Sequence, residues 1–316
     1  MGMIKYMKKL WKNSKNVIVF VFFMSIITIL TVKNKIVKDA IIESVNLFMY
    51  TLFPTLFPFF VLTNCAIALK IPLLLGKILR PIVEKWLHLE KEAGFILIMS
   101  LFTGFLAGAK YTEDMYQKGY ITEESANKLL MFTHFGNPAF VIIFMGTSVL
   151  KDIRFGILLF LLQIGCNLLI ARLIRPKKQI TNKTKQIVNE NQKNILGYAI
   201  FDSFQTLLMM LGSLTIFIIV ENLVISLIPM TPFIQMITKL LLEITSGLSS
   251  LSILTIPLRL KIMIAAVALS FGGINIHMQV ASYLENSKLK YKYFLKGRIY
   301  ATLIQIILVF LLSSII

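Results

Sequence analysis

The chain has few charged residues for its length. Only 15% of its 316 residues are Asp, Glu, Lys or Arg, whereas 57% are hydrophobic, and the mean hydropathy is +0.78. This balance excludes an ordinary soluble protein and indicates a membrane protein. Cysteine is scarce too, and Cys65 and Cys166 both lie in apolar surroundings without a CxxC pair. We therefore expect buried free thiols and no disulfide framework.

The sequence also lacks the usual signatures of catalysis. It has no GxSxG, HExxH or Walker A sequence and no cluster of metal-ligating residues, so we predict no enzyme, no metal and no other cofactor. Acidic residues are few, and 33 Lys and Arg against 15 Asp and Glu give a net charge of +18. The basic residues are spread along loops beside apolar runs, without any nucleic-acid-binding motif. Two roles explain these basic residues better than a nucleic-acid partner: they set the orientation of the chain in the membrane, and they contact anionic lipid.

What the chain does contain is apolar runs. A membrane-spanning helix needs about 17 to 25 apolar residues, and several runs come close: 17–32, 44–69, 94–109, 138–150, 155–174, 204–228 and 299–316. The run at 138–150 and the pieces between Pro232 and Gln279 are short or interrupted, which is typical of half-helices and re-entrant hairpins. We predict an all-α, polytopic membrane protein with six to eight spans.

Basic residues predict the orientation of the chain. Five lysines precede the first run, and no small-residue cleavage site follows it before Lys33, so residues 1–40 are predicted to form an uncleaved signal anchor. The positive-inside rule places the N-terminus in the cytoplasm, together with the basic, polar linker at residues 175–197. The predicted location is a cell membrane.

The linker separates two halves, residues 41–174 and 198–316, that show the same order of parts. In each half a long apolar segment leads to two polar breaks, within 103–110 and 134–138 in the first half and 243–247 and 270–279 in the second. Non-helical backbone at membrane depth is tolerated only where protein or water satisfies its polar groups. Paired breaks are the sequence sign of a transporter built from two repeats. We expect two related, inverted halves with a solute site between them.

The breaks hold the candidate binding residues. Glu243 follows three leucines, and an acid there must be paired, protonated or turned to a polar cavity. Lys110 follows two glycines, where it can face an anion, although a lysine reaching to the membrane surface is an equal alternative. If the stretch 275–279 is extended, the polar side chains of Asn275, His277 and Gln279 share one face. The alternative for His277 is a buried histidine that is hydrogen-bonded to its neighbours. The predicted substrate-binding residues are Thr103, Gly104, Gly108, Lys110, Asn137, Glu243, Thr245, Gly247, Ser270, Gly272, Gly273, Asn275, His277 and Gln279.

Three further features predict local structure. Glu221 and Asn222 interrupt an apolar run and either pair with a cation from another helix or carry protons, pairing being favoured. Pro54 and Pro58 are expected to kink the second apolar segment. Thr122 is expected to cap a surface helix.

The breaks belong to five motifs in a fixed order. These are residues 52–60 (LFPTLFPFF), 103–110 (TGFLAGAK), 135–140 (FGNPAF), 242–247 (LEITSG) and 271–279 (FGGINIHMQ). Together they resemble the sporulation integral membrane protein family of endospore-forming bacteria, the YlbJ type, within the nucleoside-recognition (gate) domain group. The resemblance covers roughly residues 44–316. Phe105 and Leu106 depart from it, since a Tyr-Pro pair is usual there.

This resemblance implies a relation to concentrative nucleoside transporters. It also implies a role in moving dipicolinic acid, a small planar dianion, across the outer forespore membrane during sporulation. The expected partners are then this anionic solute and the lipid membrane, with Na⁺ or H⁺ as the coupling ion and homo-oligomerisation left open. A nucleoside transporter of the same fold is the alternative, and a non-transporting membrane scaffold or assembly factor is the second alternative.

Overall fold

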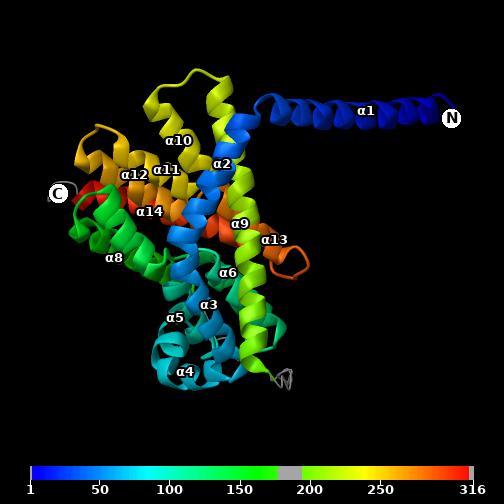
Figure 1. Ribbon diagram of the computed structural model, residues 1–316. Coiled ribbons are helices and arrows are strands. Elements are labelled where there is room, and N and C mark those ends of the chain that lie inside the picture. Colours follow the sequence, from blue (N-terminus) through cyan, green and yellow to red (C-terminus); the bar gives the residue numbers. More distant parts are fainter. Residues whose placement is uncertain (1, 177–193, 313–316) are drawn as a thin grey trace.

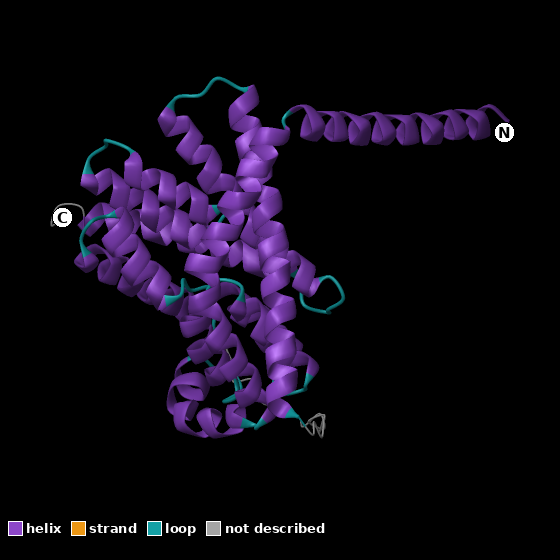
Figure 2. Ribbon diagram, in the orientation of Figure 1, coloured by secondary structure: helices purple, strands orange, loops and turns teal. Residues whose placement is uncertain are grey.

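The chain folds into helices joined by short loops (Figures 1 and 2). The computed structural model describes residues 2–176 and 194–312, with side chains from 16–176 and 194–311, and no strand occurs among them. The predicted all-α class is therefore confirmed. Most of the predicted linker, residues 177–193, lies outside the described residues.

Five helical segments are long and apolar enough to cross a membrane by length and composition. They are Asn34–Ala68, Ile153–Leu173, Ile195–Leu227, Leu258–Leu284 and Tyr291–Leu311. Five apolar helices are shorter, namely Asn16–Val32, Ala93–Thr103, Ala139–Val149, Pro232–Leu242 and Ile244–Ile253. Because a crossing takes about 17 to 25 residues, most of these are half-length pieces, as the broken runs predicted. A total of six to eight spans stays a prediction.

A helix that projects from the rest of the molecule precedes the first half (Figure 1). The elements up to the first break are α1 (Gly2–Val32), α2 (Asn34–Leu47), the π-helix η1 (Phe48–Leu52), α3 (Phe53–Ala68), α4 (Ile71–Arg80), the π-helix η2 (Pro81–Trp86) and α5 (Ala93–Thr103). Beyond it lie α6 (Ala107–Gln117), α7 (Glu123–Phe132), the π-helix η3 (Ala139–Val149) and α8 (Ile153–Leu173). That α1 is a signal anchor stays a prediction.

The second half repeats much of this order of elements. It consists of α9 (Ile195–Leu227), α10 (Pro232–Leu242), α11 (Ile244–Ile253), α12 (Leu258–Phe271), α13 (Ile274–Leu284) and α14 (Tyr291–Leu312). In both halves a long helical segment precedes two pairs of short helices, each pair joined across a break, and a long helix follows. The pairs are α5–α6 and α7–η3 in the first half and α10–α11 and α12–α13 in the second. That the halves are inverted relative to each other stays a prediction.

Local sequence accounts for several helix boundaries. Pro54 lies in the first turn of α3, directly after the π-helical turn η1, while Pro58 lies inside α3. A proline cannot donate the usual backbone hydrogen bond, which is why the long segment changes its hydrogen bonding there. Thr122 precedes α7 and accepts a hydrogen bond from the Ser125 backbone N–H, so the predicted cap is confirmed. The expectation of a surface helix is wrong, because seven of the ten residues of α7 are buried.

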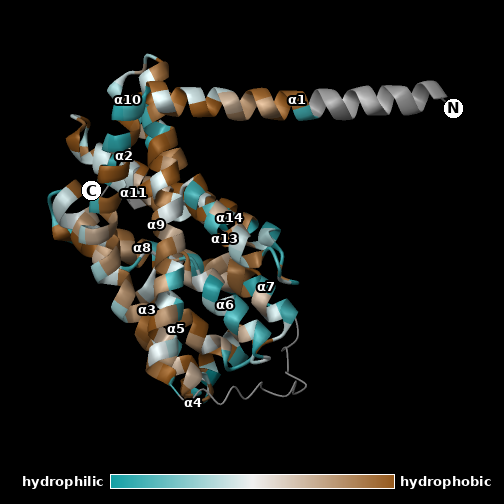
Figure 3. Ribbon diagram, turned by 45° about the vertical axis from the view of Figure 1, so that its right-hand side comes forward, coloured by the Kyte–Doolittle hydropathy of each residue, from teal (hydrophilic) through white to brown (hydrophobic). Residues whose placement is uncertain are grey.

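The outer faces of the long helices are apolar, whereas many polar side chains point inward. Phe201, Leu208 and Leu303 are each more than half exposed, and Figure 3 shows hydrophobic residues along α3, α8 and α9 with hydrophilic ones gathered on α6 and α7. Exposed apolar faces of this extent suit contact with lipid chains rather than water. The buried polar side chains must therefore form their hydrogen bonds with other groups of the protein.

Candidate solute site

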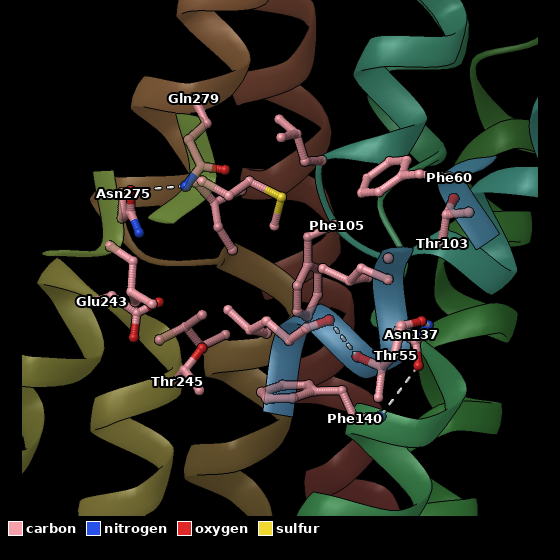
Figure 4. Close-up of a pocket in the computed structure, with 18 residues that line it drawn as sticks. Thr55, Phe60, Thr103, Phe105, Asn137, Phe140, Glu243, Thr245, Asn275 and Gln279 are labelled. Carbon is pink, nitrogen blue, oxygen red and sulfur yellow. Dashed lines mark hydrogen bonds between the residues drawn. The ribbon is translucent and has the colours of Figure 1, made fainter. Parts of the chain in front are cut away.

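The four helix breaks meet at one internal cavity (Figure 4). Its volume is about 60 Å³. Both halves of the chain contribute to its walls, since residues at or directly beside each of the four breaks line it together with α3 and α9. The lining residues are Leu52, Thr55, Leu56, Phe60, Thr103, Gly104, Phe105, Leu106, Asn137, Phe140, Met210, Leu214, Glu243, Ile244, Thr245, Asn275, Ile276 and Gln279.

Two glycines end the helices that run toward the cavity. Gly104 follows α5 with φ +96°, and Gly272 follows α12 with φ +78°. Both values lie in the region that favours glycine, because a Cβ atom there meets the backbone. The chain therefore leaves the helix at these points.

Asn137 holds the second break in place. Its Oδ1 accepts hydrogen bonds from the backbone N–H groups of Ala139 and Phe140, at 2.8 and 3.4 Å. Its Nδ2 donates to the carbonyl oxygens of Phe102 and Thr55, at 2.6 and 3.5 Å. The carboxamide of Asn137 thus uses all four of its hydrogen-bond positions on the protein itself.

The second half supplies the polar wall. Glu243 is 2% exposed and forms the N-cap of α11, where its carboxylate accepts a hydrogen bond of 2.8 Å from the Ser246 N–H. Asn275 and Gln279 lie one turn apart on α13, and Gln279 Nε2 donates to Asn275 Oδ1 at 3.0 Å and to Ser213 Oγ at 2.7 Å. Figure 4 shows Glu243, Thr245 and Asn275 on the same side of the cavity. This wall can form hydrogen bonds with a polar solute.

His277 does not join this wall. An extended stretch would place it beside Asn275 and Gln279, but α13 is helical from Ile274, so that condition is not met. Residues two apart on a helix point in different directions. The His277 ring instead contacts the Tyr291 hydroxyl at 2.7 Å through Nδ1 and the Phe271 carbonyl oxygen at 3.0 Å through Nε2. This is the alternative of a buried histidine satisfied by its neighbours.

Half of the predicted binding residues line the cavity. Those that do are Thr103, Gly104, Asn137, Glu243, Thr245, Asn275 and Gln279. The other seven support the surrounding structure. Ser270 Oγ donates to the Ala266 carbonyl oxygen, and a Cβ atom added at three of the glycines would lie within about 3 Å of another backbone. The seven residues outside the lining are Gly108, Lys110, Gly247, Ser270, Gly272, Gly273 and His277.

Lys110 is buried and contacts two aspartates instead of the cavity. Its Nζ atom is 3.1 Å from an Asp114 oxygen and 2.8 Å from an Asp202 oxygen, and the residue is 4% exposed. It therefore also differs from the alternative of a lysine reaching to the membrane surface. Asp202 belongs to α9, so its contact with Lys110 joins the two halves of the chain. Asn64 donates to the same Asp202 oxygen at 2.8 Å and completes the group.

The sequence reasoning missed Arg298, which is fully buried in α14. Its guanidinium donates to the carbonyl oxygens of Ser270 at 3.1 Å and Met131 at 2.9 Å, and to Asn167 Oδ1 at 3.2 Å. Ser270 and Met131 lie in the last turns of α12 and α7, where carbonyl groups lack helical partners and carry partial negative charge. Arg298 thus joins two helix ends. Little in the sequence signals this role, because Arg298 directly precedes the apolar run at 299–316 and follows Lys292 and Lys296, where a basic residue at the membrane surface is expected.

Comparison with known proteins finds a similarity to "Sporulation integral membrane protein YlbJ" of Bacillus subtilis (strain 168), at 27% identity over 78% of this chain and 70% of that protein. No protein-family model matches the chain, and no solved structure matches it. The gate-domain grouping therefore stays a prediction. The similarity that the five motifs predicted is confirmed, and the chain resembles the sporulation integral membrane protein YlbJ over most of its length.

Proposed function

We propose that the protein moves a small organic solute across the membrane by alternating access, with the cavity as its solute site. The observation that carries this proposal is the meeting of all four helix breaks at one cavity. Half-helices that end at a shared site direct backbone groups and helix dipoles toward a solute. A scaffold protein needs breaks for packing at most, and has no need for them to meet at one cavity.

The cavity is too small to hold the proposed solutes as it stands. At about 60 Å³ it is far smaller than the roughly 300–1,000 Å³ of typical small-molecule sites. Its walls come from both halves of the chain, so a movement of one half relative to the other enlarges it. Such a movement is the structural basis of alternating access.

Dipicolinic acid is the first proposed solute. The homologous protein is named for sporulation, and the family resemblance implies dipicolinate transport across the outer forespore membrane, with the N-terminus in the cytoplasm. The rings of Phe60, Phe105 and Phe140 line the cavity, and flat aromatic walls favour a planar ring through stacking and edge contacts.

A nucleoside is the second candidate. Glu243 is the one ionisable residue among the described lining residues, and no Lys, Arg or His joins it. An acid without a neighbouring cation disfavours a dianion and favours a neutral solute with N–H and O–H donors. Dipicolinate binding in this cavity therefore requires that its charge be compensated by protons or a cation.

Calorimetric titration of the purified protein in nanodiscs with dipicolinate and with uridine tests these proposals. We expect saturable binding of one of the two solutes. Substituting Gln279→Ala is expected to weaken that binding about tenfold, since one hydrogen bond contributes about 1–1.5 kcal/mol. Gln117→Ala, an exposed glutamine in α6, is the matched control and is expected to bind like the wild type.

The outcomes separate the candidate functions. Uridine binding alone assigns the cavity to nucleosides. If a well-folded wild-type protein binds neither solute, the dipicolinate and nucleoside proposals are both wrong and a scaffold becomes the better explanation. Equal loss of binding in the Gln117→Ala control would show that the Gln279→Ala result reports on folding instead of the site.

A further inference from the structure

A second carboxylate lies directly behind the cavity. Ser246 contacts two glutamates at once: its backbone N–H donates to Glu243 Oε2 at 2.8 Å, and its hydroxyl donates to Glu221 Oε2 at 2.7 Å. Glu221 belongs to α9 and its side chain is fully buried, while Glu243 lines the cavity. The first turn of α11 therefore holds two buried carboxylates.

The polar groups continue from Glu221 toward the surface. Lys239 Nζ, on α10, lies 3.5 Å from Glu221 Oε1 and 3.9 Å from Glu43 Oε1 on α2, and Asn222 donates to Glu43 Oε2 at 3.1 Å. The pairing of Glu221 with a cation from another helix is as predicted. Side-chain exposure rises outward, from 0% for Glu221 to 17% for Lys239 and 39% for Glu43. A chain of ionisable groups thus connects the cavity wall to the surface.

Glu43, the outermost of these ionisable groups, lies in an open groove. Glu43 lines it together with Asp39 and Asn46, along α2 and η1. Asp39 and Glu43 are five and nine residues after the start of α2 at Asn34, which corresponds to about 8 and 14 Å of helix. The Glu43 side chain, which is 39% exposed, is therefore the point where this row of ionisable groups meets the surface of the protein.

Among the buried ionisable groups there are more carboxylates than cations. Lys239 is the cation that faces Glu221 from α10, and Glu43 faces both from α2; α13 contributes only the amides of Asn275 and Gln279 to this side of the cavity. One lysine compensates one of the two buried carboxylates. Glu221 Oε1 accepts no hydrogen bond. A buried acid without a cation or a full set of donors is stable when it carries a proton.

We propose that Glu221 and Glu243 share a transported proton that couples solute movement to a proton gradient. The proton is taken from water in the groove at Glu43, binds a Glu221 oxygen, passes to Glu243, and is released to water in the cavity when that side opens. Lys239 lies between Glu43 and Glu221 and gives one N–H proton to Glu221 while it regains one from Glu43, so each N–H or O–H bond that breaks is matched by one that forms. The coupling rests on the proposed transport function, whereas proton binding by the pair does not require it.

Uptake into proteoliposomes tests the coupling. With one proton per solute, a gradient of one pH unit drives accumulation of up to about tenfold. We expect the ratio of solute uptake with a pH gradient to solute uptake without one, measured with dipicolinate and with uridine, to fall to about one in Glu221→Gln, whose carboxylate does not line the cavity. Glu124→Gln is the matched control, because that carboxylate is 61% exposed and contacts Lys128 on the surface; its ratio is expected to match the wild type.

Infrared difference spectra between acidic and alkaline pH test proton binding without any solute. We expect a protonated carboxylic acid band that is lost or shifted in both Glu221→Gln and Glu243→Gln and unchanged in Glu124→Gln. If the band is the same in all four proteins, or if uptake occurs equally with and without a gradient, the coupling proposal is wrong while transport stands. If neither solute is taken up but the band behaves as expected, the proton pair stands and the transport proposal fails.

Discussion

Replacing Arg298 with methionine is expected to lower the free energy of unfolding by at least about 3 kcal/mol. The substitution leaves three buried oxygens without their donor, those of Ser270, Met131 and Asn167, and each unsatisfied buried acceptor costs about 1–3 kcal/mol. Thermal unfolding in detergent, followed by the loss of the monodisperse peak in size-exclusion chromatography, measures the effect. The apparent melting temperature is expected to fall by roughly 6–12 °C.

Arg154→Met provides the matched control for this experiment. The Arg154 side chain is 84% exposed and contacts Asp152 two residues away. Exposed ion pairs contribute about 0–1 kcal/mol, so its loss is expected to change stability little. Equal melting temperatures for the Arg298→Met variant and the wild type would contradict the assigned role of Arg298 in joining α7 and α12.

Substituting Gly108→Ala is expected to be the most disruptive single-methyl change in the first half. A Cβ atom at this position in α6 lies 1.9 Å from the carbonyl oxygen of Thr133 and 2.8 Å from its carbonyl carbon. Both are backbone atoms, so the segment that leads to Asn137 must move away. Overpacking costs about 1–3 kcal/mol and occasionally more, and we expect a value at or above the top of that range together with reduced solute binding.

Gly212→Ala is the control for the same chemical change. This residue lies within α9, and no atom comes within 4 Å of an added Cβ. Alanine favours the helix over glycine by about 0.5–1 kcal/mol, so stability is expected to stay equal or rise. The prediction for Gly108 is wrong if both alanine variants unfold at the same temperature.

The main features of the fold could be predicted because backbone N–H and C=O groups within a membrane need hydrogen-bond partners, and helices provide these partners. Gly104 interrupts an apolar run, and only a protein-lined or water-lined break satisfies its neighbours. The π-helical form of η3 was not predicted, because it depends on tertiary packing. A Cβ atom added at Gly156 in α8 would lie 2.4 Å from the Ile142 carbonyl oxygen in η3, and the sequence shows the glycine without showing that partner.

The site was predicted only in part, because the sequence shows the polar residues within apolar runs but not the partners they contact. Asn275 and Gln279 were predicted as polar side chains on one face of an extended stretch. They do share a face, but because α13 is helical and they lie four residues apart. The position of Lys110 was not predictable, because its partner Asp202 lies 92 residues away on another helix. His277 shares the same motif as Asn275, but its direction depended on where α13 begins.

The polar lining residues of the two halves differ in how much hydrogen-bonding capacity they have left. In the first half the hydroxyl hydrogens of Thr55 and Thr103 are donated to backbone carbonyls, and Asn137 has no position free. In the second half the Oε1 atom of Gln279 accepts no hydrogen bond among the described residues, and Glu243 carries the carboxylate. The first half therefore determines the shape of the space offered to a solute, and the second half determines its chemistry. Solute selectivity is then expected to follow α10–α13 in chimeras between related proteins, whichever protein supplies the first half.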